Sequence, residues 1–244
     1  LSTKLTKHDP KTKTIYHNKV VMKLLSFPVF YIPYLEQPDW TVKRRSGFLT
    51  PTIGYSKQNH FETSIPYYLA TKDKTWDMTY TAHYKGKSGH ANQFNFRKQF
   101  ETSFLDSDLY FGNLDTNKQK DDDVFGFIYN FDSKIKNWKL SSEAKYSDQD
   151  TFMKRYNFDG STEYKSFIKA EKVSENKISD IEIYNIESVE EGVNSQNEPF
   201  MAPNISHHKF ISNEFLNYEV KLNAHQIVDD ERYDIQRWTG STEI

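Results

Sequence analysis

Apolar and polar residues alternate with a period of two over most of the chain after Phe48. The clearest segments are 76–84, 94–101, 125–131, 138–146 and 216–224, and in each of them aromatic or aliphatic residues occupy most of the alternate positions. Because successive side chains of a strand point to opposite faces, each segment predicts a strand with one apolar and one polar face. The segments are about 9–12 residues long, which suits a tilted strand that crosses a bilayer. Their spacing predicts an all-β chain with roughly a dozen antiparallel strands after Gly47, and no segment has a helical period.

The first 41 residues have a different pattern of apolar and polar positions. Residues 1–26 predict short strands separated by turns at Asp9-Pro10 and His17-Asn18. Residues 27–41 contain three prolines, at positions 28, 33 and 38. Each proline removes one donor from a strand ladder, so this segment predicts an edge strand or a connector. Between the alternating segments, the polar runs 113–123, 147–160 and 189–197 predict long connectors, mixed with shorter ones.

The change of pattern at Ser46-Gly47 predicts a boundary between two architectures. We therefore divide the chain into residues 1–40 and residues 46–244. A basic cluster, Lys43-Arg44-Arg45, immediately precedes Ser46-Gly47. Two roles remain open for the cluster: a phosphate-binding patch or an interfacial anchor at the start of a strand.

Composition bears on which kind of β-protein this is. Aromatic residues make up 16% of the 244 residues and all hydrophobic residues only 36%, an unusual ratio for a soluble core. Alternating strands also occur in soluble sandwiches and barrels that have one wet face. An outer-membrane barrel explains the aromatic face and the charged opposite face better. The candidates for side chains that face a hydrated lumen are Asp77, His83, Asn95, Arg97, Gln99 and Glu101. The mean hydropathy of −0.82 does not decide the question, because only alternate residues of a barrel strand face lipid.

No motif for catalysis, a metal or a cofactor is found in the sequence. The adjacent pair His207-His208 would point to opposite faces of a strand and so would not share a metal. Ser46-Gly47 lacks the frame of a nucleophile elbow, and Asp121-Asp122-Asp123 lacks the ligand spacing and glycine of a calcium loop. There is no cysteine, which excludes disulfides and thiolate metal sites in this stretch. The net charge of −2 gives no indication of nucleic-acid binding. We expect a protein that is not an enzyme.

Three blocks resemble one known family. They are residues 27–35 (FPVFYIPYL), 44–51 (RRSGFLTP) and 65–68 (IPYY). The similarity continues through residues 76–81 and 94–100. Together these blocks resemble the LPS-assembly protein LptD family, also called OstA or Imp. The similarity is specific from about residue 20 to residue 100 and loose after about residue 160.

The resemblance implies a transporter of the Gram-negative outer membrane. In that family, a periplasmic β-jellyroll receives lipopolysaccharide from a periplasmic LptA-like bridge. A large barrel then inserts the lipid into the outer leaflet through a lateral gate, with an LptE-like plug lipoprotein in its lumen. Residues 1–40 would then be the end of the jellyroll, and residues 46–244 the N-terminal half of the barrel. The chain begins and ends within a pattern, which predicts a fragment of a longer protein.

The resemblance also implies a role for two prolines. In the family, prolines in the first two barrel strands weaken the lateral gate, and the matching positions are Pro51 and Pro66. Without the resemblance, the simpler interpretation is that both prolines begin or kink strands. Two other functions stay open: a different outer-membrane barrel, such as a porin or receptor, and a soluble all-β module that binds carbohydrate.

Overall fold

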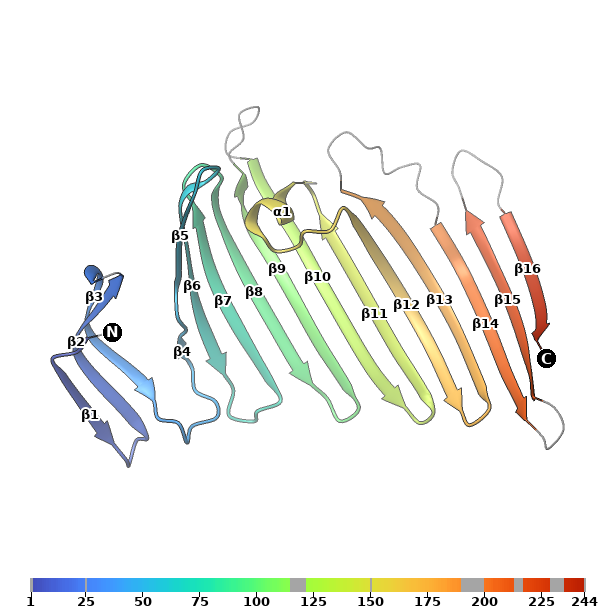
Figure 1. Cartoon of the computed structure of the whole chain (residues 1–244), viewed down its shortest axis with the longest axis horizontal. Helices are drawn as coiled ribbons and strands as arrows, with labels where there is room; N and C mark the ends of the chain where they lie inside the picture. Colours follow the sequence, from blue (N-terminus) through green and yellow to red (C-terminus); the bar gives the residue numbers. More distant parts are fainter. Residues whose placement is uncertain are drawn as a thin grey trace. The chain divides into compact units, whose positions relative to one another are not determined.

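The computed structural model describes residues 2–24, 26–114, 122–149, 151–189, 200–212, 217–228 and 235–243. The chain divides into two compact units, Leu1–Gly47 and Phe48–Ile244. Both units are built from antiparallel β-strands (Figure 1). The prediction of an all-β chain with roughly a dozen antiparallel strands after Gly47 is therefore confirmed. Which domains the two units represent stays a prediction.

The first unit is a three-stranded sheet in the order β1-β2-β3. Its strands are β1 (Leu5–Asp9), β2 (Thr14–Leu24) and β3 (Phe27–Pro38). The turn expected at His17-Asn18 is wrong, because β2 continues through it. His17 and Asn18 pair with β1 on one side and with β3 on the other, and this double pairing overrides the local turn preference. β3 carries the three prolines and lies at the end of the strand order, as predicted for an edge.

The second unit is a 13-stranded antiparallel sheet. Its strands are β4 (Gly47–Phe48), β5 (Thr52–Ser56), β6 (His60–Ala70), β7 (Trp76–Lys85), β8 (Gly89–Gln99), β9 (Ser103–Leu114), β10 (Asp122–Ile135), β11 (Trp138–Ser147), β12 (Glu163–Ser174), β13 (Lys177–Ser188), β14 (Phe200–Ser212), β15 (Asn217–Val228) and β16 (Ile235–Glu243). From β6 to β16, strands that are consecutive in the sequence pair with each other, and β4 and β5 both pair with β6. Since β4 and β16 end the order, the sheet is open.

The register gives the sheet an aromatic face and a polar face. On the aromatic face, one row of directly paired residues crosses six strands: Tyr67, Tyr80, Phe94, Leu109, Phe127 and Tyr146. On the polar face, a parallel row crosses five strands: Asp77, Arg97, Asp106, Asn130 and Glu143. The period-two alternation in the sequence therefore extends across the sheet, because consecutive hairpins keep it in register.

The connections at the two ends of the sheet differ in length. At one end the turns are short, at 71–75, 100–102, 136–137 and 175–176 (Figure 1). At the other end, the connection between β11 and β12 contains helix α1 (Phe152–Tyr156). The sequence pattern did not predict this helix. The expected long connectors at 113–123 and 189–197 lie largely outside the described residues. Within the described ranges, no helical segment has the length and apolarity that a membrane span requires.

Candidate functional site

The first strand of the large sheet is interrupted. β4 ends at Phe48, β5 begins at Thr52, and Pro51 lies in the gap between them. Proline has no N–H to donate to a ladder, which accounts for a break at this position. β5 pairs only with the His60–Ser64 half of β6. The other half of β6 therefore has only the two-residue strand β4 on this side.

Pro66 lies on β6 opposite this interruption. Its carbonyl accepts a hydrogen bond from the amide of Leu49, with N and O 2.9 Å apart. β5 pairs with β6 in a register that places Thr52 opposite Ser64. The bond between Leu49 and Pro66 is displaced from this register by one residue. In an antiparallel strand, the N–H and C=O of one residue point to the same neighbour. The donor that Pro66 lacks is therefore missing on the side of the first strand, so both prolines weaken the same pairing.

Four of the predicted lumen residues form one hydrogen-bonded area on the polar face. Arg97 Nε lies 2.8 Å from Asp77 Oδ1, and the two residues are direct cross-strand partners. Asn95 donates to Asp106 and Asp108 of the next strand, at 2.8 and 3.2 Å. His83 lies on the same face between Ser64 and Gln93, with ring nitrogens 2.9 and 3.1 Å from their side-chain oxygens.

The other two predicted lumen residues lie at or beyond the end of β8. Gln99 is the last residue of the strand, and its amide donates to the carbonyls of Phe100 and Ser103 across the turn. Glu101 lies in that turn, so it does not belong to the polar row in which the alternation placed it. β8 ends because the chain must reverse within three residues to begin β9 at Ser103.

The basic cluster lies in an irregular segment before β4. The guanidinium of Arg45 donates to Thr14 Oγ1 at 2.5 Å and lies 3.4 Å from a carboxylate oxygen of Glu36. Both partners belong to the first unit. Arg45 is thus bound within its own unit, which favours a structural role for this residue over a phosphate-binding one. The roles of Lys43, Arg44, Ser46 and Gly47 stay predictions.

The alternation did not reveal one further feature, which we name the strap: residues 151–162, including helix α1. The strap lies on the polar face, near the end with the long connections (Figure 1). Phe152, Met153 and Tyr156 are buried against Tyr110 and Val124 of the sheet. The spacing of these three strap residues corresponds to one helical face, and this was a signal in the sequence within a connector that is largely polar.

Polar contacts add to the apolar packing of the strap. The hydroxyl of Tyr156 lies 3.2 Å from the carbonyl of Ser88, in the turn between β7 and β8, and 3.2 Å from the carbonyl of Asn113, in β9. Lys85 Nζ donates to the carbonyl of Arg155 at 2.7 Å. Gly126 of β10 leaves room for the strap, since a Cβ there would lie 2.9 Å from Met153 Sδ. The strap is therefore held to four consecutive strands, β7–β10, or to the turns that join them.

An ion pair joins the end of the strap to β11. Lys145 Nζ lies 2.9 Å from Asp159 Oδ2 and 3.3 Å from Glu143 Oε1. Burial opposes ionisation of Asp159. The hydrogen bonds from Ser161 and Lys145 outweigh that effect and hold the pKa of the Asp159 carboxyl below its usual value.

Among the described residues, no three metal-ligating side chains come together. His207 and His208 contact different partners on opposite faces, Ser179 and Glu219. What the geometry offers is therefore a polar surface, an aromatic surface and a weakly paired first strand.

Known proteins resemble part of this chain. No family model matches it. LPS-assembly protein LptD of Vibrio vulnificus (strain YJ016) is 30% identical over 154 residues, 59% of this chain and 18% of that protein. LPS-assembly protein LptD of Salmonella choleraesuis (strain SC-B67) is 36% identical over 119 residues, 48% of this chain and 14% of that protein. The same protein of Sodalis glossinidius (strain morsitans) is 45% identical over 90 residues, 37% of this chain and 11% of that protein.

The matched region is thus less than a fifth of each relative's length. Over about half of its own length, the chain is a homologue of proteins named LPS-assembly protein LptD.

Proposed function

We propose that this chain is part of an outer-membrane protein that inserts lipopolysaccharide into the outer leaflet. The observation that supports this most is the division of the large sheet into an aromatic face and a charged, hydrogen-bonded face. Such strands suit a barrel that has lipid on one side and water on the other. The name carried by its relatives supplies the substrate.

In this proposal, residues 1–40 are the end of a periplasmic β-jellyroll, and residues 46–244 are the N-terminal half of the barrel. The protein performs transport without making or breaking a covalent bond. Its partners are lipopolysaccharide, outer-membrane lipid, an LptE-like plug lipoprotein against the polar face, and a periplasmic LptA-like bridge at the first unit. β3 ends the strand order of the first unit among the described residues, and such a bridge would add a strand at this edge.

The lateral gate is proposed at the first strand of the large sheet. The support comes from Pro51, which lies between β4 and β5, and from Pro66, whose missing donor faces the same strand. A bilayer offers no water to replace a missing backbone hydrogen bond. A first strand with few bonds to its neighbour moves aside at lower cost than a fully paired one.

Depletion of the protein in its Gram-negative host tests the function. Surface lipopolysaccharide should fall, and sensitivity to large hydrophobic antibiotics should rise, as the protein is lost. Re-expression of the wild-type chain should reverse both effects. Unchanged surface lipopolysaccharide would count against the proposal. A porin would instead be revealed by solute flux through reconstituted vesicles, and a soluble carbohydrate-binding module by recovery in the aqueous phase without detergent.

A further inference from the structure

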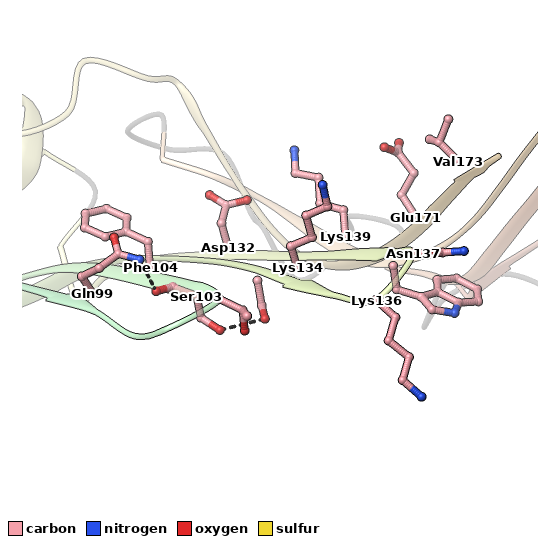
Figure 2. Close-up of a pocket in the computed structure, with 13 residues that line it drawn as sticks. Gln99, Ser103, Phe104, Asp132, Lys134, Lys136, Asn137, Lys139, Glu171 and Val173 are labelled. Atoms are coloured by element: carbon pink, nitrogen blue, oxygen red, sulfur yellow. Dashed lines mark hydrogen bonds between the residues drawn. The ribbon is translucent and has the colours of Figure 1, made fainter. Parts of the chain in front are cut away.

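A cleft of about 610 Å³ lies at the short-turn end of the large sheet. It extends from the turn between β8 and β9 to β12, and includes the turn between β10 and β11 (Figure 2). Three lysines line it within six residues of sequence: Lys134, Lys136 and Lys139. Figure 2 shows Lys134 and Lys139 projecting to one side of the sheet and Lys136 to the other.

Lys134 and Lys139 are direct partners across the β10–β11 hairpin. Directly opposed residues of an antiparallel pair have Cβ atoms about 5 Å apart, and like charges in that position repel each other. Both side chains are exposed on the polar face, so the two ammonium groups share one area of the cleft. An anion held between them would remove the repulsion.

The other lysines of the polar face are neutralised. Lys85, Lys145, Lys165, Lys169 and Lys221 each lie within 3.5 Å of a carboxylate oxygen. Within the described ranges, neither Lys134 nor Lys139 has such an ion pair. Glu171 is the cross-strand partner of Lys139 on its other side, but the carboxylate of Glu171 lies 3.3 Å from Lys169. In the part of the chain that the structure describes, the cleft is therefore lined by two directly paired lysines, neither of which forms an ion pair.

We propose that Lys134 and Lys139 bind a phosphate group in this cleft. Two ammonium groups supply several donors to the oxygens of a phosphomonoester, and hydrogen bonds between charged groups are the stronger kind. The phosphate belongs either to a lipid headgroup or to a free phosphate ion. The binding site itself rests on the charges and the register, and it holds whether or not the protein exports lipopolysaccharide.

The carboxylate of Asp132 limits which anions bind. It lies two residues before Lys134, on the same side of the sheet, and lines the same cleft (Figure 2). A carboxylate repels a second anion, so Asp132 should weaken phosphate binding without preventing it. Asp132→Asn is therefore expected to strengthen phosphate binding. This result would distinguish a phosphate site from a cleft in which Asp132 itself neutralises the two lysines.

Calorimetry on the full chain in neutral detergent micelles tests the site. Inorganic phosphate and a short-chain phosphatidic acid are titrated separately at low salt. Saturable binding is expected, and K134Q with K139Q should weaken it about tenfold or more. The matched control is K177Q with K209Q. Lys177 and Lys209 are also direct cross-strand partners, but they lie on the aromatic face and outside the cleft.

Binding of both probes, lost with the Lys134 and Lys139 substitutions and kept in the control, supports a general phosphate site. Binding of phosphatidic acid alone, with the same dependence, supports a lipid headgroup. The proposal is overturned if neither probe binds, or if both pairs of substitutions weaken binding equally. Loss of folding is not expected to confuse the result, because removing two like charges relieves repulsion. The thermal midpoint of K134Q with K139Q should equal or exceed that of the wild type without phosphate.

Discussion

The ring of Phe158 in the strap stacks on the ring of Tyr110 in β9, with centroids 4.2 Å apart and planes inclined by 25°. Phe158 also meets the ring of His83 edge-on at 4.9 Å. These contacts place an apolar cluster on a face that is otherwise charged and amide-rich. The strap therefore covers part of the polar face of β7–β10 and leaves less of that face accessible.

Removing the best-buried strap side chain should release the strap. Phe152 has an exposed fraction of 0%. Replacing a fully buried phenylalanine by alanine typically costs about 3–5 kcal/mol. We expect Phe152→Ala to leave the strands intact and to expose the bonds after Lys154 and Arg155 to trypsin. The measurement is the rate of cleavage at these two positions in the folded protein.

A matched control for this substitution is Phe111→Ala. Phe111 lies on the aromatic face and is 44% exposed, so its removal should not change the rate of cleavage in the strap. Equal protection of the strap in wild type and Phe152→Ala would contradict the assigned role of Phe152.

Strap docking should depend on pH through Asp159. Its pKa is lowered in the folded state. The charged carboxylate therefore favours docking at pH values above the usual carboxyl pKa of about 3.9, and this contribution is lost as the pH falls through the lowered value. We expect docking to be constant from about pH 7 to pH 5 and to weaken below about pH 4.

The measurement is the emission of an environment-sensitive fluorophore on Gly160→Cys. Gly160 has open space where its side chain would be, and the chain has no other cysteine. Asp159→Asn should remove the pH dependence. Asp73→Asn is the control, because the Asp73 carboxyl also has a lowered pKa. Asp73 lies in the turn between β6 and β7 and not in the strap, so this variant should keep the pH dependence. The same pH profile in both variants would refute the role of Asp159.

The sequence allowed the two faces of the sheet to be predicted, because alternation is a local property and short turns transmit it between strands. Asp77, Asn95 and Arg97 share a face for that reason alone. Their partners Asp106 and Asp108 follow once the next hairpin is in register. The turn expected at His17-Asn18 failed because pairing on both sides of β2 outweighed local preference.

The spacing of Phe152, Met153 and Tyr156 was the one local signal for the strap, and it was too short to predict the helix or its position on the sheet. The helix has five residues, too few for a periodicity to stand out. Its position depends on contacts between residues far apart in sequence, such as Tyr156 with Ser88. Similarly, Pro51 indicated an interruption of the first strand. The one-residue offset at Leu49 and Pro66, however, depends on how two strands pair, so the sequence of either strand alone does not predict it.

Single-cysteine labelling should separate the two faces in a bilayer. A fluorophore at Phe127→Cys lies on the aromatic face, and one at Asn130→Cys lies on the polar face of the same strand, β10. In vesicles that contain brominated lipids, we expect strong quenching at position 127 and little at position 130, because a barrel strand presents alternate residues to lipid. Similar quenching at both positions, or the reverse order, would rule out the proposed orientation.

The two prolines give the last prediction. Pro51→Ala with Pro66→Ala restores two N–H donors next to the pairing of β6 with the first strand. Each new hydrogen bond should stabilise that pairing by about 0.5–1.5 kcal/mol. If the first strand moves aside during export, a stronger pairing should lower surface lipopolysaccharide and raise sensitivity to large hydrophobic antibiotics. The control is Pro203→Ala, which changes a proline of β14 and leaves the first strand of the large sheet untouched. Normal surface lipopolysaccharide and unchanged sensitivity in the Pro51 and Pro66 variant, at normal protein levels, would show that weak pairing of this strand is not needed for export.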